Sequence, residues 1–270
     1  MILVNGVQTD SLSVHDRGLM YGDGVFRTLR VSRGAALCWR RHFHKLQADC
    51  TAINIECPSG IVLGKEVEAV AKTNPECVVK IIITRGVGTR GYRVARGAAP
   101  NRVVMSGPLP DYPASHYRDG VTVRICDLRL GLQPRLAGIK HLNRLENVLA
   151  RQEWSDETIA EGLLLDGEGH VISGTMTNLF MLKGVELCTP DLSRCGIAGV
   201  QRERVLERAG KAGIVCKVSA IALPELLQAD EAFLTNSIIG VWQIREIGKK
   251  RWDPGCFVPM VRDWLDRDCD

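Results

Sequence analysis

The sequence predicts a mixed α/β protein with two domains, and three observations support this prediction. The chain has 270 residues, 45% of them hydrophobic and 24% charged, so it is long enough for a large core and more than one domain. Strand-like and helix-like stretches alternate along its whole length. Residues 109–120 contain two prolines and no periodicity, so we expect a linker between a smaller N-terminal α+β domain, 1–108, and a larger C-terminal domain, 121–270.

The N-terminal domain is predicted to contain a sheet and two helices. The run CVVKIIITR, 77–85, is almost continuously apolar and rich in β-branched residues, which is typical of a buried strand. An Asn-Gly turn signal follows the strand-like residues ILV at the start of the chain. The other predicted strands are 2–4, 25–31, 33–39 and 101–107, and the predicted amphipathic helices are 40–55 and 61–73.

Strand and helix patterns restart after the linker. The stretch GLLLDGEGHVISGTMTNLFML, 162–182, is predicted to form a hairpin that turns at Asp166–Gly169. The remaining predicted strands are 121–130, 184–190, 214–218 and 231–247, and the predicted helices are 141–153, 196–210, 223–228 and 257–267.

Composition and charge argue against several classes of protein. The net charge of +4 is small and scattered, which suits anionic small molecules and does not indicate a nucleic-acid partner. No apolar stretch approaches the roughly 20 residues of a membrane span. The N-terminus, MILVNGVQTD, lacks the basic start and long apolar core of a signal peptide, so we expect a cytoplasmic protein with no membrane partner.

The ten cysteines predict neither a disulfide framework nor a metal site. No pair has C-x-x-C spacing, and many cysteines lie in apolar segments, so we expect reduced thiols in a reducing compartment. His42 and His44 are a tempting pair of metal ligands. Two histidines on a basic, helix-like segment are more often structural or surface residues, and we therefore predict no metal.

The segment GIKHLNRLENVL, 138–149, carries a candidate nucleophile. Lys140 follows the flexible Gly138 and precedes a helix-like pattern in which leucines recur on one face. One interpretation is a solvated surface lysine. The other is an amine nucleophile that forms a Schiff base. The local pattern does not decide between these interpretations.

Three further segments are consistent with one anion site. Gly196 to Gly199 lead into a predicted helix, whose N-terminal N–H groups and dipole would suit a phosphate. Asn236 lies in Thr-Asn-Ser at a strand end, and Lys45 lies on a basic helix-like segment. Each also has an ordinary interpretation: a glycine-rich helix cap, a turn, and a solvated helix face.

The loop RGVGTRGYR, 85–93, is rich in glycine and arginine. Its glycines let the backbone bend, and its arginines can bind carboxylates with two parallel hydrogen bonds. A substrate with carboxylates would explain this composition, although a surface loop without a ligand is equally consistent with it.

Six segments, in this order, resemble one enzyme family. They are DRGLMYGDGVFRT (16–28), RGVGTRGY (85–92), GIKHLNRLENVL (138–149), TNLF (177–180), GIAGVQRE (196–203) and LPELLQADEAFLTNS (223–237). The resemblance is to the fold-type IV pyridoxal-phosphate enzymes and covers essentially the whole chain. Within that class, IKHLNRLE and RGxGxRGY resemble the aminodeoxychorismate lyases more than the branched-chain or D-amino acid aminotransferases.

The resemblance implies a fold, a cofactor and the residues that bind it. It implies a homodimer in which each chain has two α/β domains with pyridoxal 5′-phosphate between them. Lys140 would hold the cofactor as a Schiff base. The phosphate would meet the backbone at Ile197 and Ala198, the side chain of Asn236, and Lys45.

The resemblance also implies a reaction. The lyases remove pyruvate from 4-amino-4-deoxychorismate and leave 4-aminobenzoate, a folate precursor. Lys140, once displaced by the substrate amine, could take the proton from the carbon that bears this amine. Arg90, Tyr92 and Arg85 are our candidates for binding the carboxylates of the substrate.

Two positions depart from the family pattern. Ser173 stands where the family usually has a glutamate that pairs with the pyridine nitrogen of the cofactor. A serine can donate a hydrogen bond there but supplies no negative charge, so the ring should be a weaker electron sink. Lys45 stands where relatives usually have arginine, so a weaker grip on the phosphate is expected.

Two alternatives to the lyase remain. One is an aminotransferase of the same fold that acts on D- or branched-chain amino acids, which the missing glutamate argues against. The other is a catalytically silent relative that binds the cofactor, which Ser173 favours and an intact Lys140 argues against.

Overall fold

The computed structural model describes residues 1–95 and 97–267, and the chain divides into two compact units. The first unit contains Met1–Pro110 together with Ile139–Asn143, and the second contains Asp111–Gly138 and the chain from Arg144 onward. The sequence assigned Lys140 to the C-terminal domain. The structure instead groups its short segment with the first unit, because its backbone pairs with a strand of that unit.

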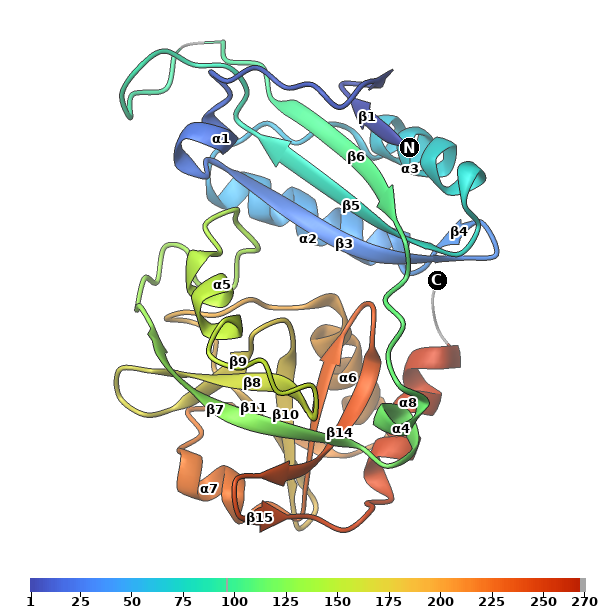
Figure 1. Ribbon diagram of the computed structural model, residues 1–270, viewed down its shortest axis with the longest axis vertical. Coiled ribbons are helices and arrows are strands. Elements are labelled where there is room, and N and C mark those ends of the chain that lie inside the picture. The colour runs from blue at the N-terminus through green and yellow to red at the C-terminus, as the bar shows by residue number, and fades with distance from the viewer. Residues whose placement is uncertain (96, 268–270) are drawn as a thin grey trace. The chain divides into compact units, whose positions relative to one another are not determined.

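The first unit is a six-stranded antiparallel sheet in the order β2-β1-β6-β5-β3-β4. Its strands are β1 (Ile2–Val4), β2 (Val7–Gln8), β3 (Gly24–Ser32), β4 (Ala35–Ala36), β5 (Cys77–Thr84) and β6 (Asn101–Gly107). Its helices are α1 (Arg17–Tyr21), α2 (Trp39–Ala52) and α3 (Gly60–Thr73). The two long helices cover one face of the sheet (Figure 1).

Burial along β5 explains this arrangement. Cys77, Val79, Ile81 and Ile83 are buried beneath the helices, while the residues between them are half-buried. The apolar run therefore forms a strand as predicted, but only one of its faces is in the core formed by α2 and α3. The other face carries Lys80, the one charged residue of the strand.

The second unit is a nine-stranded mixed sheet in the order β12-β11-β10-β13-β14-β7-β8-β9, with β15 beside β14. Its strands are β7 (Val121–Leu130), β8 (Ile159–Asp166), β9 (Val171–Gly174), β10 (Asn178–Lys183), β11 (Glu186–Pro190), β12 (Val215–Ser219), β13 (Glu231–Asn236), β14 (Gly240–Ile247) and β15 (Lys250–Arg251). Its helices are α4 (Ala114–Arg118), α5 (Leu145–Arg151), α6 (Val200–Lys211), α7 (Leu223–Leu227) and α8 (Phe257–Arg267).

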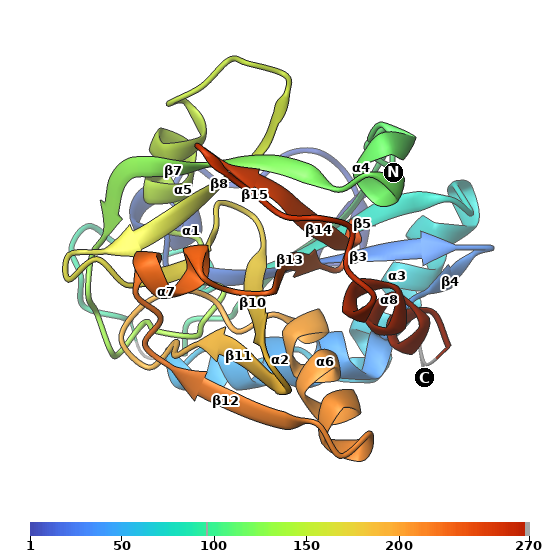
Figure 2. The same ribbon diagram turned by 90° about the horizontal axis from the view of Figure 1, so that it is seen from below.

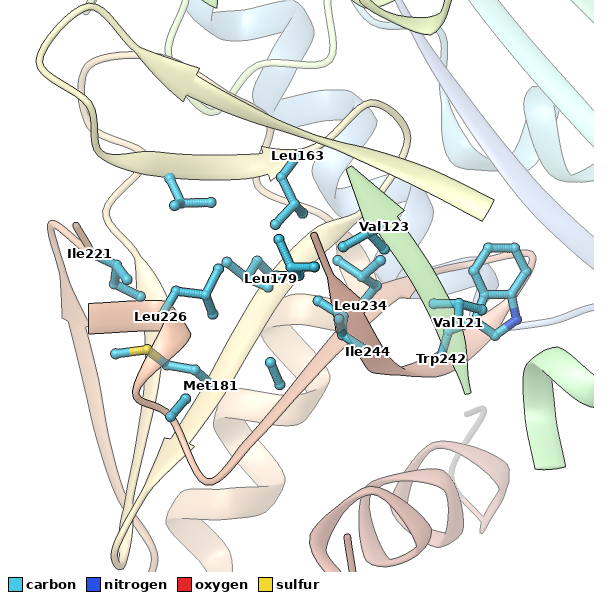
Figure 3. Close-up of a cluster of buried hydrophobic side chains, with 14 of the residues drawn as sticks. Val121, Val123, Leu163, Leu179, Met181, Ile221, Leu226, Leu234, Trp242 and Ile244 are labelled. Carbon is cyan, nitrogen blue, oxygen red and sulfur yellow. The ribbon is translucent and has the colours of Figure 1, made fainter. Parts of the chain in front are cut away.

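Three apolar clusters hold this unit together. Branched side chains such as Leu163, Leu179 and Leu234 converge from several strands in the larger cluster (Figure 3). On the other side, α6 and α8 contact each other and cover β13 and β14 (Figure 2). The apolar face predicted for 257–267 faces this second cluster, with Val261 fully buried.

The predicted linker is partly helical. Residues 114–118 form α4, and the rings of Tyr112, His116 and Tyr117 pack against the buried Trp242. The sequence pattern missed this short helix because its order comes from contacts with a distant strand.

The helix predicted for 141–153 is also shorter than expected. Helix α5 begins at Leu145, so Lys140 lies before the helix, next to a residue that forms a β-bridge with β3. Leu142 and Leu145 are therefore not on one face of a helix, as their spacing had suggested. Leu145 and Leu149 are 68% and 47% exposed. The leucine stripe that suggested a core-facing helix is therefore largely outside the core of this chain.

The nine cysteines within the described residues are all free thiols, most of them buried. Cys269 lies outside the described residues. Among the helices of residues 1–95 and 97–267, none has the length and hydropathy needed to span a membrane.

Replacement of Trp242 by alanine should test the core of the second unit. Trp242 is fully buried beneath three aromatic rings, so Trp242→Ala should lower the free energy of unfolding by about 3–5 kcal/mol. Urea denaturation followed by far-ultraviolet circular dichroism measures this change. Val185→Ala is the control, because Val185 is 85% exposed and should change stability by less than about 0.5 kcal/mol. A loss near zero for Trp242→Ala would contradict the packing described above.

Candidate active site

Lys140 lies on a main-chain segment that pairs with the start of β3. The Phe26 N–H donates to the Lys140 carbonyl, and the Leu142 N–H donates to the Gly24 carbonyl, each at 2.9 Å. The Lys140 side chain is half-buried, and its Nζ lies 4.4 Å from the centroid of the Phe26 ring. A side chain at Gly24 would collide with Leu142 and with the Ile83 carbonyl, so this close pairing requires glycine. The lysine is thus carried by a firmly bonded backbone.

A buried carboxylate on α2 contacts the same segment. The Lys140 N–H donates to Asp49 Oδ2 at 3.2 Å, and Arg27 from β3 forms an ion pair with that oxygen. Burial raises the pKa of Asp49, and the charges of Arg27 and Lys45 offset only part of that effect. Lys45 lies one helical turn before Asp49. The structure thus brings two predicted residues, Lys140 and Lys45, together around a carboxylate that the sequence analysis did not single out.

A second lysine faces the same aromatic ring. Lys80 Nζ lies 4.9 Å from the centroid of the Phe26 ring, so Lys80 and Lys140 are close neighbours. Lys80 was not predicted as a site residue. The position of Lys80 in the sequence could have indicated it, because Lys80 is the only charged residue in the apolar run CVVKIIIT.

In the second unit, the loop before α6 pairs with Gly138. The Gly138 N–H donates to the Gly196 carbonyl, and the Ala198 N–H donates to the Gly138 carbonyl, each at 3.0 Å. Ala198 therefore uses its N–H within the chain, whereas the Ile197 N–H donates to no other described residue.

Asn178 holds the same loop from β10. Its Nδ2 donates to the Ile197 carbonyl (2.8 Å), and its Oδ1 accepts from the Gly199 N–H (3.0 Å). Gly199 caps α6 without a side-chain hydrogen bond, so the first N–H groups of that helix remain available to an anion. A side chain at Gly199 would collide with Asn178, which explains the glycine.

Asn236 ends β13 and uses most of its amide within the chain. Its Oδ1 accepts from the N–H groups of Ile238 and Ile239, both at 2.8 Å, and its Nδ2 donates to the Met176 carbonyl at 3.2 Å. The second hydrogen of this Nδ2 is the group that a phosphate could engage. Asn236 thus also fixes the turn at 174–177, which leads into Asn178.

Glu161 holds that turn from the opposite side. It is almost completely buried, and it accepts from the N–H groups of Thr175 and Met176 and from the hydroxyls of Thr175 and Thr177. Burial raises the pKa of Glu161, and these hydrogen bonds offset part of the effect. Glu161 was not predicted as a site residue, since a lone acid in an apolar strand has no distinctive spacing.

Ser173 lies on β9, opposite Leu164 of β8. The residue is 7% exposed. Together with Ile197 and the start of α6, Ser173 gives the second unit several polar groups that fit a phosphorylated heterocycle.

The arginine-rich loop is held by residues of its own unit. Arg85 donates to the Asp23 carboxylate and to the carbonyls of Ile53 and Asn54. Arg17 from α1 donates to Asp23 as well. Because every nitrogen of the Arg85 guanidinium is engaged, Arg85 supports the loop and is a poor candidate for binding a substrate carboxylate.

The other two predicted residues of this loop are accessible. Arg90 is exposed, and Tyr92 is 87% exposed with its ring 5.4 Å from that of Tyr21. The carbonyls of Gly91 and Tyr92 accept from Arg17, which therefore shapes the loop tip. The sequence analysis missed Arg17, although it lies in the quoted motif DRGLMYGDG.

The metal-ligand candidates have structural explanations. Asp166, Glu168 and His170 offer ligand atoms within 4.8 Å of one another. Asp166 accepts from the N–H groups of Glu168 and His170, so the group closes the turn between β8 and β9. His42 is buried and His44 is exposed, so these two histidines do not share an environment.

Comparisons with known proteins show which family and which structures the chain resembles. The sequence model of the amino-transferase class IV family matches residues 24–247. The aminodeoxychorismate lyase of Vibrio harveyi is 36% identical over 242 residues, which are 89% of each chain. A putative branched-chain-amino-acid aminotransferase of Methanocaldococcus jannaschii is 29% identical over 91% of this chain and 87% of its own. The crystal structure of 4-amino-4-deoxychorismate lyase from Pseudomonas aeruginosa superposes with a TM-score of 0.96, 42% identity and full coverage of both chains.

The Asp23 cluster should make stability sensitive to acid. Burial alone would raise the pKa of Asp23, but Arg85 and Arg17 outweigh it, so the pKa lies below the ordinary 3.8. The ionised carboxylate therefore stabilises the fold above pH 3.8, and this contribution is lost as the pH falls below that value. Asp23→Asn should cost roughly 3 kcal/mol at pH 7, and the difference from wild type should shrink below pH 3.8.

Urea denaturation at pH 7 and at several values below pH 3.8 measures this difference. Asp119→Asn is the control. Asp119 forms an ion pair with Arg118 in which both side chains are exposed, and such pairs contribute little to stability. If the difference in the free energy of unfolding between wild type and Asp23→Asn stays constant with pH, the lowered pKa of Asp23 is refuted.

Proposed function

Because the chain belongs to the amino-transferase class IV family, we propose that it is a pyridoxal-phosphate-dependent lyase that converts 4-amino-4-deoxychorismate to 4-aminobenzoate and pyruvate. The observation that carries the proposal is the 42% identity, over the full length of both chains, with the lyase of Pseudomonas aeruginosa. The similarity to the Vibrio harveyi lyase supports it independently. The lysine that the reaction needs is present at position 140.

The residues that we propose as ligands of the cofactor are those that the family resemblance implies. Lys140 would hold the carbonyl carbon of pyridoxal phosphate through its amine. The phosphate would accept from the Ile197 N–H, from the first N–H groups of α6 and from Asn236, with Lys45 adding charge. The Ala198 N–H, predicted as a further donor, already donates to the Gly138 carbonyl. When bound, the cofactor supplies an electron sink for a carbanion.

Lys140 is the general base of the proposed reaction. Its amine takes the proton from the substrate carbon that carries the amino group. The C–O bond to the enolpyruvyl group breaks, the bonding electrons leave with the oxygen, and the ring becomes aromatic. Enolpyruvate accepts a proton and becomes pyruvate, so atoms and electrons balance without an oxidant.

Cations of the first unit are suited to the two substrate carboxylates. Arg90 is exposed on its loop, Tyr92 beside it offers a hydroxyl, and Lys80 shares the Phe26 ring with Lys140. A lysine binds a carboxylate as a point charge, whereas an arginine can form two parallel hydrogen bonds. We do not include Arg85, since its guanidinium is engaged by Asp23 and two carbonyls.

Two rival functions are separable from the lyase. The Methanocaldococcus jannaschii relative favours an aminotransferase acting on branched-chain amino acids, and Ser173 argues against it. A catalytically silent relative would bind the cofactor without turnover. We also propose a homodimer, for which light scattering should give twice the 29.7 kDa of one chain.

The lyase proposal is tested by cofactor binding and product release. The wild-type protein should become yellow with pyridoxal phosphate and should release equimolar pyruvate and 4-aminobenzoate. Lys140→Ala should lose the visible band and at least about 1,000-fold in kcat/KM, because it removes both the attachment point and the base. Lys211→Ala is the control, because Lys211 lies at the far end of α6 and is exposed. Transfer of amino groups to a keto acid without 4-aminobenzoate would favour the aminotransferase.

Introduction of an acid at position 173 tests why elimination is preferred over transamination. A carboxylate would keep the pyridine nitrogen protonated and strengthen the electron sink, on which transamination depends most. We expect Ser173→Glu to raise transamination of D- or branched-chain amino acids by roughly tenfold while 4-aminobenzoate formation changes less. Ser173→Gln is the matched control of the same size without charge. Equal transamination rates in the two variants would contradict this explanation.

A further inference from the structure

We propose that Asp49 is a positioning residue that fixes the backbone of Lys140 for covalent capture of the cofactor. This inference rests on the proposed function, because it gives Lys140 a carbonyl compound to capture. Three observations support it: the contact with the Lys140 N–H, the burial of Asp49, and the bonded state of the rest of the Lys140 backbone.

Asp49 and Phe26 hold the Lys140 peptide groups from two elements. Asp49 Oδ2 on α2 accepts from the Lys140 N–H at 3.2 Å, and the Phe26 N–H on β3 donates to the Lys140 carbonyl at 2.9 Å. Both peptide groups next to the Lys140 Cα are therefore fixed. The amine, at the end of a long side chain, is further limited by the Phe26 ring 4.4 Å away.

Burial of the Asp49 carboxylate costs desolvation free energy, which argues that this side chain does more than fill space. The side chains of Asp49 and Arg27 are 8% and 3% exposed, and buried ion pairs of this kind rarely stabilise a fold more than apolar residues would. A charged acceptor nevertheless makes a stronger hydrogen bond to a backbone N–H than a neutral one. The carboxylate therefore stabilises one particular backbone position of the reactive lysine.

The competing explanation is that Asp49 only joins α2 to β3 through Arg27. Two double variants separate these roles. Arg27→Met with Asp49→Leu removes the ion pair and the acceptor, and Arg27→Met with Asp49→Asn removes the ion pair but keeps an oxygen for the Lys140 N–H. Leucine and asparagine are similar in shape, so the variants differ chiefly in that acceptor.

Two ligands report on position and on binding separately. Pyridoxal 5′-phosphate reacts with the Lys140 amine and gives a visible band, whereas pyridoxamine 5′-phosphate has no carbonyl and binds only non-covalently. Stopped-flow absorbance with the cofactor-free protein measures the rate constant of capture. Fluorescence titration measures the Kd of pyridoxamine phosphate.

We expect the leucine variant to capture pyridoxal phosphate about tenfold more slowly than wild type, and the asparagine variant within about threefold. The Kd of pyridoxamine phosphate for both variants should lie within about twofold of the wild-type value. Equal capture rates in the two variants, or a parallel loss of affinity for both ligands, would overturn the proposal. Glu66→Gln is the control, since Glu66 forms another largely buried pair in this unit, with Arg102.

Further outcomes are distinguishable. If the double variants do not fold by circular dichroism, Asp49→Leu alone provides the test: it removes the acceptor, so capture should slow about tenfold, and an unchanged rate overturns the proposal. If wild-type protein gives no visible band, the proposed function itself fails. A normal wild-type band with no difference among the variants defeats only the role of Asp49.

Discussion

Main-chain hydrogen bonds on both sides of Lys140 are the constraint on which the candidate site depends. The Lys140 N–H donates to Asp49 on α2, and the Lys140 carbonyl accepts from the Phe26 N–H on β3. A lysine on a free loop would pay the entropy of ordering each time it reacted. Here the backbone is ordered by folding, so only the side-chain torsions remain to be fixed. The same pairing explains why the helix that follows starts late, at Leu145.

Buried acids specify the irregular backbone of both units. Asp49 accepts from the Lys140 N–H, Glu161 from the turn at 174–177, and Asp16 from Gly18 at the start of α1. Glu231 likewise accepts from the first N–H groups of α8. Loops cannot satisfy their own N–H groups as helices and strands do. A carboxylate in the core can do so for several N–H groups at once, despite the desolvation that burial imposes on it.

This explains what sequence patterns could and could not predict. Periodicity located β5, α3, α8 and the hairpin turn between β8 and β9, because each repeats one burial pattern over many residues. It missed α4, whose order comes from contact with Trp242. The glycine-rich segments and Lys140 were found by resemblance, whereas Asp49, Glu161 and Arg17 were not. Single buried charges act through distant partners, and no spacing rule reveals such partners.

The distribution of charge bears on the choice between elimination and transamination. The acids discussed above are committed to backbone N–H groups or to arginines, and Ser173 supplies no charge where the family usually has an acid. The candidate substrate ligands Arg90 and Lys80, and the candidate phosphate ligand Lys45, are cationic. Such groups suit a phosphate and a substrate with two carboxylates, and they offer no anion to keep the pyridine nitrogen protonated. An elimination that ends in an aromatic ring has a large driving force of its own and tolerates a weak electron sink. A reversible amino transfer has no comparable driving force, so the same charge distribution that attracts the dicarboxylate disfavours the rival reaction.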